Sequence, residues 1–403
     1  MSARAFEIAA IAAVLIAASV LISRRSLRSG LVLFSLYAAQ AGCLIWASRT
    51  IGAAPWSSFS RLMFLTALLA VLSHRVATYA FPRQPAARDL LIVPAVHVAQ
   101  AWLVLELVLW PIRTLAMPAS SSIDGWVLAA PLVFSAAGLA WTHRRPRITR
   151  LRVVLRSLRR PLRVIHLSDL HLGPYLPESR LSWLTDVVSR ESGDLVAITG
   201  DFLTLRAQQD WTPILRFVER LHAPDGVYAC LGNHDAEVAD KLSATLRASG
   251  VTVLRDEVAW LESRDGHAPV AVAGLDWRSG RGQQRAYERA FAMLCDAVGH
   301  EGPSVVLCHQ PSAFRVAPPA FDGIVLAGHL HGGQVGISWA GRGVSILRLF
   351  GMYDQGLFTR GKAWLYSHRG TGVYGFPMRL GVPAEVAVLS LVPEGADLTG
   401  HAW

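Results

Sequence analysis

The chain has 403 residues, of which 52% are hydrophobic and only 17% are charged. An ordinary soluble domain carries about 25% charged residues, and the composition excludes a disordered chain, a collagen-like chain and a disulfide scaffold. The formal net charge of +10 would suggest a nucleic-acid-binding protein if it were spread evenly along the chain.

The charge is instead concentrated beside the apolar half of the chain. Residues 1–143 carry a net charge of +6, residues 144–160 carry eight arginines and no acidic residue, and residues 161–403 carry −4. Arginines next to apolar segments mark membrane topology or contact with anionic lipid. We therefore expect membrane lipids as partners and no nucleic acid.

Residues 1–143 are predicted to form a transmembrane helical region of about five helices. A bilayer-spanning helix needs roughly 20 apolar residues. Five runs approach that length, and they cover residues 5–22, 30–48, 61–81, 89–110 and 125–142. With five spans, fourteen arginines fall on one side of the membrane and four on the other. The positive-inside rule then predicts a multi-pass protein of the inner cell membrane, with everything after residue 143 in the cytoplasm.

The first apolar run and the arginines that follow it allow two alternative interpretations. Residues 5–22 could be a cleaved signal peptide, but Ser23-Arg24-Arg25 is a poor cleavage context. The same arginines also resemble a twin-arginine export signal. A topogenic charge cluster is the favoured interpretation, because further apolar runs follow it.

Residues 144–160 are predicted to be a basic juxtamembrane linker. Its spaced apolar residues, from Ile148 to Leu158, fit a short amphipathic segment that lies on an anionic leaflet. An ordinary connector fits them equally well.

From residue 161 the pattern changes to alternating strands and helices, which predicts an α/β layered domain over residues 161–403. Strands are expected at residues 163–168, 194–199, 227–231, 251–254, 269–273, 304–308 and 323–327. Helices are expected at residues 178–190, 210–221, 236–248 and 284–298. Residues 344–393 are rich in glycine and aromatic residues, which indicates short strands that close the domain.

Five polar motifs each follow one of these strands, at the edge where an open α/β sheet places its ligands. They are Asp169-Leu170-His171, Gly200-Asp201, Gly232-Asn233-His234-Asp235, His309 and Gly328-His329-Leu330-His331. Carboxylate, imidazole and amide groups suit Mn, Fe or Zn, and a carboxylate can bridge two cations. Two cations about 3.5–4 Å apart favour in-line displacement at phosphorus. The motifs therefore predict two divalent metal ions, with Mn preferred to Fe or Zn.

This series of motifs resembles the calcineurin-like metallophosphoesterase superfamily. The stretches Ser168–Gly173 and Ala327–Gln334 resemble its YkuE/YaeI-like branch, and so do Arg369–Gly372 and Pro377–Glu385. The resemblance covers about residues 161–393 and implies a layered α-β-β-α catalytic domain. Some relatives carry several membrane spans before the same domain.

The resemblance also implies a role for each residue of the motifs. The first metal would be held by Asp169, His171 and His331, and the second by Asn233, His309 and His329, with Asp201 bridging them. His234 would contact the phosphoryl oxygen or protonate the leaving group. Asp235 would orient His234 without touching the metals.

Two neighbouring residues are interpreted as structural, and one neighbouring segment departs from the pattern of relatives. His166 is expected to be a strand residue and not a ligand. Cys308 lies in an apolar strand, which favours a buried thiol over a nucleophile. Phe202-Leu203-Thr204 follows the Gly-Asp motif at the place where relatives often have an acidic residue, so contacts to the substrate are expected to differ.

The expected function is that of a membrane-anchored metallophosphoesterase. A metal-activated hydroxide would hydrolyse a phosphomonoester, phosphodiester or pyrophosphate bond. The membrane brings lipid-linked substrates into consideration, such as UDP-diacylglucosamine or a phospholipid. A nuclease is disfavoured by the negative charge of residues 161–403.

Two alternatives belong to other functional classes. A non-catalytic membrane sensor or scaffold would have lost metal ligands, whereas all seven expected ligands and His234 are present. A transporter with a regulatory phosphoesterase-like domain would need polar residues in several spans, and only the segment His97–Glu106 offers them.

Overall fold

The computed structural model describes residues 137–395, except for positions 139, 143, 174–175, 205–209, 263–268, 300–301, 340–341 and 374–378. The predicted transmembrane runs fall outside the described residues, apart from the end of the run at 125–142. Within the described residues, no helix is both long enough and apolar enough to cross a bilayer.

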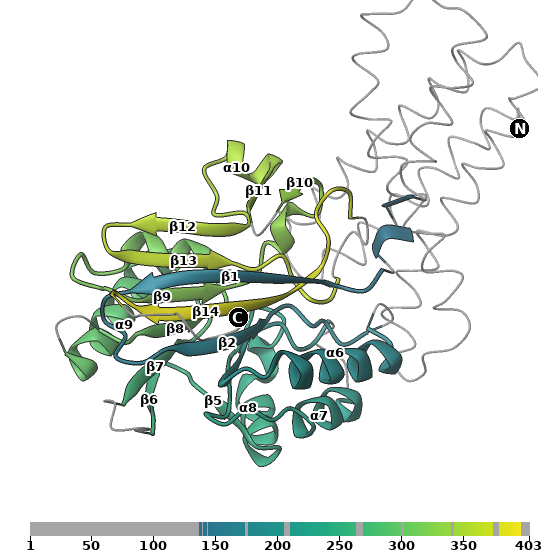
Figure 1. Cartoon of the computed structure of the whole chain (residues 1–403), viewed down its shortest axis with the longest axis horizontal. Coiled ribbons are helices and arrows are strands. Elements are labelled where there is room, and N and C mark those ends of the chain that lie inside the picture. The colour runs from purple at the N-terminus through teal and green to yellow at the C-terminus, as the bar shows by residue number, and fades with distance from the viewer. Residues whose placement is uncertain are drawn as a thin grey trace, which may run out of the picture. The chain divides into compact units, whose positions relative to one another are not determined.

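Two six-stranded mixed sheets form the centre of the described domain (Figure 1). The first sheet has, in spatial order, β1 (Arg147–Leu155), β14 (Glu385–Pro393), β2 (Leu162–Leu167), β3 (Leu195–Thr199), β4 (Val227–Cys230) and β5 (Val251–Val253). The second has β12 (Gly356–Arg360), β13 (Ala363–Ser367), β9 (Ile324–Ala327), β8 (Val305–Cys308), β7 (Val270–Leu275) and β6 (Glu257–Leu261). Strands β10 (Gly336–Trp339) and β11 (Arg342–Ser345) form a separate antiparallel hairpin.

Four strands in each sheet run parallel, and this sets where the loops lie. Strands β2 to β5 are parallel in the first sheet, and β14 pairs antiparallel to β2 but parallel to β1. Strands β7, β8, β9 and β13 are parallel in the second sheet, with antiparallel strands β6 and β12 at its edges. Parallel neighbours bring the loops at their carboxyl ends to one edge of each sheet.

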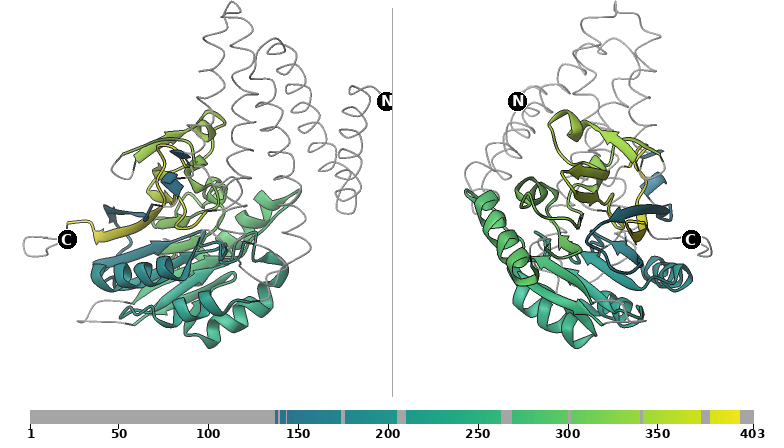
Figure 2. Two further views of the ribbon diagram at one scale, coloured as in Figure 1. Left: turned by 90° about the vertical axis from the view of Figure 1, so that its right-hand side faces the viewer. Right: turned by 60° about the vertical axis from the view of Figure 1, so that its left-hand side comes forward.

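Helices connect the strands and cover the outer faces of the sheets (Figure 2). The longer helices are α6 (Glu178–Glu191), α7 (Thr212–Glu219), α8 (Ala239–Ala248) and α9 (Gln283–Val298). The short ones are η1 (Ala236–Val238), η2 (Pro311–Val316), η3 (His331–Gly333) and α10 (Ile346–Leu349). Every strand and helix predicted between residues 163 and 327 is present, with ends that differ by at most three residues.

Three apolar cores show how the layers are stacked. One core lies between the sheets and joins residues such as Val164 and Ala197 to Leu307 and Leu326. A second packs α6, α7 and α8 against the outer face of the first sheet, and a third packs α9 and η2 against the second sheet. Strands that are buried on both faces consist of consecutive apolar residues, so these strands could be predicted from the sequence.

The predicted linker at 144–160 is corrected by the structure. Strand β1 occupies Arg147–Leu155 and pairs along its whole length with β14, so this segment belongs to the first sheet. Its exposed residues Arg150, Arg152 and Val154 alternate with Leu151, Val153 and Leu155, of which the last two are buried. The spacing that suggested an amphipathic segment therefore belongs to an edge strand.

Candidate metal centre

The five predicted motifs lie in loops at the carboxyl ends of β2, β3 and β4 in the first sheet and of β8 and β9 in the second. Five of their residues adopt the left-handed backbone conformation that side chains rarely take. Their φ angles are 53° for Asp169, 49° for His171, 52° for Asp201, 71° for His329 and 49° for His331. Such backbone strain gathers at functional sites, and here it turns the loops sharply enough for the side chains to converge.

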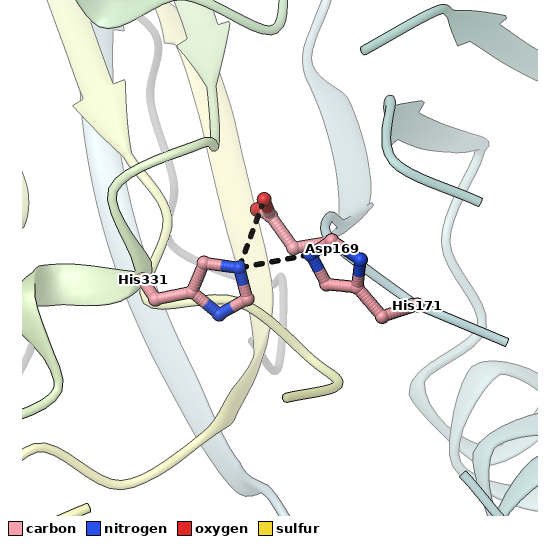
Figure 3. Close-up of side chains that lie close together, drawn as sticks. All are labelled: Asp169, His171 and His331. Atoms are coloured by element: carbon pink, nitrogen blue, oxygen red, sulfur yellow. Dashed lines mark hydrogen bonds and ion pairs between the residues drawn. The ribbon is translucent and has the colours of Figure 1, made fainter. Parts of the chain in front are cut away.

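The first group of side chains consists of Asp169, His171 and His331 (Figure 3). The Nε2 atoms of His171 and His331 lie 3.0 Å apart, and Nε2 of His331 lies 3.3 Å from Oδ1 of Asp169. All three side chains are buried. The backbone N–H of His329 and the hydroxyl of Ser168 donate to the Asp169 carboxylate and hold it in place.

Asp201 lies between the two groups of predicted ligands. Its Oδ2 is 3.6 Å from Nε2 of His171 and 3.2 Å from Nε2 of His309. Its Oδ1 accepts the backbone N–H of His234 at 2.8 Å. A Cβ atom at Gly232 would overlap Oδ1 of Asp201, so the glycine of that motif is needed for this close approach.

The second group surrounds the side-chain oxygen of Asn233. This Oδ1 lies 3.1 Å from Nε2 of His309 and 2.8 Å from Nδ1 of His329. The ligand atoms of Asp201, His309 and His329 lie within 4.8 Å of one another. The structure thus brings together all seven residues predicted to hold the metals.

Backbone carbonyls fix the orientation of two of the rings. Nδ1 of His171 donates to the carbonyl of Leu203 at 3.2 Å, and Nδ1 of His309 donates to that of Thr199 at 2.7 Å. In each ring this directs Nε2 at the shared space, as in histidines that bind metal. Converging carboxylate, amide and imidazole donors of this kind fit divalent Mn, Fe or Zn.

Burial and charge set the protonation of the centre. Burial lowers the pKa of His171 to about 3 and that of His329 to about 4, so both rings are neutral. Burial would also lower the pKa of His309, but the carboxylate of Asp201 raises it to about 9, so without a cation this ring is protonated and its Nε2–H faces Asp201. The same pairing holds the pKa of Asp201 below its usual range, against the effect of burial. Ionised carboxylates and neutral imidazoles are the forms that bind cations.

Comparisons with known proteins agree with this geometry. The model of the calcineurin-like phosphoesterase family matches residues 162–333. An uncharacterized metallophosphoesterase of Aquifex aeolicus is 30% identical over 240 residues, which are 58% of this chain and 86% of that protein. The chain belongs to the metallophosphoesterase family.

Two further relatives match the branch that the sequence resembled. The uncharacterized metallophosphoesterase YkuE of Bacillus subtilis is 28% identical, over 57% of this chain and 78% of that protein. Phosphodiesterase YaeI of Escherichia coli is 27% identical, over 58% of this chain and 83% of that protein. The chain is therefore a metallophosphoesterase with an intact set of metal-binding Asp and His groups.

In this metallophosphoesterase, Asp235 accepts hydrogen bonds from the backbone of two loops. Its carboxylate accepts the backbone N–H groups of Phe202, Leu203 and Gly232 at 3.0–3.3 Å. The ring of His234 is held by the carbonyl of Thr204, which accepts from Nδ1 at 3.0 Å. Asp235 thus shapes the loops around the centre. In these contacts the segment 202–204 contributes backbone groups. A backbone group is present whatever the side chain is, so these hydrogen bonds do not need the acidic residue that relatives often have here.

Trp277 is a neighbour of the centre that the sequence did not reveal. It follows β7, is partly exposed, and its ring lies 5.6 Å from that of His309 and 5.2 Å from that of His329. Ion pairs hold the residues on either side of it in the chain: Asp276 pairs with Arg255, and Arg278 pairs with Asp256. The indole is therefore held in place before any substrate arrives.

Arg379 contacts the other side of the centre. It is fully buried, and its guanidinium lies 3.3 Å from Nδ1 of His331. Burial lowers the pKa of Arg379 to about 10, so it stays positively charged. A guanidinium can only donate, so Nδ1 of His331 accepts and Nε2 of this ring carries the proton that faces Asp169.

A buried polar network lies behind Asp169. Glu385 accepts from the hydroxyl of Tyr366 at 3.1 Å and from the backbone N–H of Arg369 at 2.9 Å, and it pairs with the Arg369 guanidinium. Thr371 links this network to the centre, because its N–H donates to the carbonyl of Ser168. Several of these residues lie in stretches that resemble the family, but the sequence assigned them no role.

The structural interpretations of Cys308 and His166 are confirmed. Cys308 is fully buried in β8, and burial raises the pKa of its thiol to about 12. His166 lies in β2, and its Nε2 is 2.8 Å from Oγ1 of Thr199, away from the predicted ligands.

Proposed function

We propose that this metallophosphoesterase acts through two metal ions bridged by Asp201. The observation that carries the proposal is the position of Oδ2 of Asp201, within 3.6 Å of Nε2 of both His171 and His309. Asp169, His171 and His331 would hold one ion, and Asn233, His309 and His329 the other. Bound there, the ions would supply positive charge to the phosphoryl oxygens and lower the pKa of a water molecule.

His234 is proposed to act on the phosphoryl group. Burial lowers the pKa of His234, and its Nδ1–H donates to Thr204, so the neutral ring keeps its lone pair on Nε2. An anionic phosphoryl group beside the ring favours the protonated form. Nε2–H would then donate to a phosphoryl oxygen or pass its proton to the leaving group.

The proposal includes attachment to the membrane. The apolar runs and the unequal distribution of arginines support a multi-pass inner-membrane protein with its catalytic domain in the cytoplasm. A tethered centre acts on what reaches the membrane surface, which favours a lipid-linked phosphoester or a phospholipid as substrate. The name of the Escherichia coli relative, a phosphodiesterase, supports a diester bond as the reacting group.

The test uses the full chain in detergent, stripped of metal with a chelator. Hydrolysis of bis-p-nitrophenyl phosphate is measured as Mn is added back, for the wild type, for Asp201→Ala and for Asp186→Ala. Asp186 is an exposed residue of α6 and serves as the matched control. We expect Mn-dependent hydrolysis in the wild type and the control, and a loss of more than about 100-fold in Asp201→Ala.

Two results would count against the proposal. Equal turnover by Asp201→Ala and the wild type would exclude a bridging role for this carboxylate. Absence of turnover by the folded wild type with Mn, Fe or Zn would exclude the metal-dependent diesterase.

A further inference from the structure

Seven large apolar side chains project into solvent from one part of the domain. They form what we call the apolar patch: Val335, Ile337, Val344, Ile346, Leu349, Phe350 and Met352. Leu349 is 81% exposed, Phe350 74% and Ile337 71%. They belong to β10, β11, α10 and the adjoining residues, which stand beyond β12 at one end of the domain in Figure 1. Soluble monomers rarely expose contiguous apolar side chains in this number, so the patch indicates a contact surface.

The apolar patch is joined directly to the metal centre. Helix η3 contains His331 and ends at Gly333, and Val335 follows two residues later. The backbone N–H of Leu380 donates to the carbonyl of Gln334, and that of Gly336 donates to the carbonyl of Leu380. Leu380 is next to Arg379, whose guanidinium contacts His331. Whatever covers the patch therefore lies beside the site of reaction.

Residues Arg379 and Leu380, which we call the base of the patch because Leu380 is hydrogen-bonded to Gln334 and Gly336, also lie next to the end of the last predicted membrane run. Thr142 is the final residue of the run at 125–142, and its hydroxyl oxygen accepts the backbone N–H of Arg379 at 3.2 Å. The carbonyl of Thr142 also accepts from the guanidinium of Arg180. A chain that leaves a bilayer near Thr142 would thus bring the base of the patch close to the lipid surface.

The charge around the patch suits an anionic leaflet. Between His331 and Tyr353 the chain has two arginines and no acidic residue, and the exposed Arg315 donates to the carbonyl of Gly351 beside the patch. Arg348 pairs with the buried Asp354, which follows Tyr353, so that ion pair adds no net charge. Apolar side chains beside basic ones are typical of segments that lie in the headgroup layer.

We propose that the apolar patch inserts into the headgroup layer of the membrane and holds the metal centre at the lipid surface. This inference deepens the proposed function and rests on its membrane attachment. A protein partner or the chain's own apolar region are other occupants, and the experiment below separates them from lipid.

The experiment uses the full chain in vesicles of phosphatidylethanolamine and phosphatidylglycerol. Cys43 is replaced by serine, and the three cysteines of the described domain are buried. An environment-sensitive fluorophore is attached in Leu349→Cys, and in Ala244→Cys as the matched control. Ala244 is an exposed residue of α8. Helix α8 lies at the end of the domain opposite α10 in Figure 1. We expect lipids that carry a nitroxide to quench the label at position 349 several-fold more strongly than the label at position 244.

A second pair of samples tests whether the apolar side chains cause the insertion. The label is placed in Ile346→Cys, with and without the substitutions Leu349→Asp and Phe350→Asp. We expect the two acidic substitutions to abolish quenching by nitroxide lipids. Unchanged quenching would overturn the proposal, because the apolar side chains would not be what inserts.

Two further results would also overturn it. Equal, weak quenching at positions 349 and 244 would show that the patch stays in water. A blue-shifted label at 349 that nitroxide lipids do not quench would show that protein covers the patch. Quenching needs no turnover, so hydrolysis of bis-p-nitrophenyl phosphate by the same samples tests the phosphoesterase proposal separately.

Discussion

Two histidines outside the predicted metal ligands, His166 and His368, are buried side by side behind the centre. Their ring centroids are 4.7 Å apart. Nε2 of His368 donates to the carbonyl of His166, and Nδ1 accepts the N–H of Gly370. Burial lowers the pKa of His368 to about 3, so the ring is neutral in the folded protein at every physiological pH.

This neutral histidine should make the domain sensitive to acid. Below pH 6.5 the unfolded chain binds a proton at His368, whereas the folded chain does not until about pH 3. The free energy of unfolding therefore falls by about 1.4 kcal/mol per pH unit below 6.5 on account of this residue. We expect His368→Gln to remove that part of the slope in urea unfolding of the full chain with chelator present. The exposed His222→Gln is the control, and equal slopes in all three proteins would contradict the prediction.

Trp277 allows a second prediction at the scale of single residues. Its ring rests against those of His309 and His329, which the proposal assigns to the second metal. We expect Trp277→Ala to raise the Mn concentration for half-maximal hydrolysis by about tenfold, because residues that orient ligands affect metal affinity to this degree. Trp277→Phe should retain most of the affinity. Trp260→Ala, at a half-exposed position of β6, is the control, and a midpoint unchanged in Trp277→Ala would refute the argument.

The elements differ in how far the sequence alone predicts them. Strands β2, β3, β4, β8 and β9 are buried on both faces, so their apolar runs stand out. Strand β1 was missed because its arginines dominate the pattern and because it pairs with β14, at the opposite end of the domain's sequence. Strand β6 was missed because only Leu261 of its five residues is buried.

The place of β1 in the first sheet predicts a stability difference between two neighbours. Leu155 is fully buried between the sheets, whereas Val154 is 44% exposed. We expect Leu155→Ala to lower the free energy of unfolding by about 2–5 kcal/mol, and Val154→Ala by less than about 1 kcal/mol. Urea unfolding of the full chain measures both. Similar small losses would mean that β1 is not an integral strand.

At the scale of the whole molecule, Glu385 joins the two sheets beneath the metal centre. It begins β14 of the first sheet, whereas its partners Tyr366 and Arg369 belong to β13 of the second sheet and to the loop that follows it. Thr149 of β1 also donates to it. A charge buried to this extent is stable only while its partners are present.

This ion pair gives a prediction for the domain as a unit. We expect Arg369→Met to lower the free energy of unfolding by about 3–5 kcal/mol, because the charge of Glu385 would stay buried without its partner. Adding Glu385→Gln to Arg369→Met removes that charge. In a double-mutant cycle, we expect the loss in free energy of unfolding of the double variant to be smaller than the sum of the two single losses by about 1 kcal/mol or more. Additive losses in urea unfolding would show that the pair is not coupled.

The candidate site was predictable to the extent that it is built from local motifs. Each predicted ligand lies shortly after the end of a strand. The order of the motifs along the chain was therefore enough to predict that these residues meet at one edge of the sheets. Trp277, Arg379 and Glu385 reach the centre only through the packing of distant segments, which no local pattern records. The backbone hydrogen bonds of Asp235 were not predictable for the same reason, since its partners Phe202 and Leu203 come from another loop.

Strand β14 enters the first sheet between β1 and β2, the two earliest strands of the described domain. During synthesis on the ribosome, β1 and β2 emerge first and then wait while residues 168–384 are made. Until residues 385–393 appear, both strands keep a row of unpaired backbone groups, the kind of edge that aggregates or binds chaperones. A chain cut short before Glu385 would leave its first sheet open, so the cell could recognise it as incomplete before it ever met a substrate.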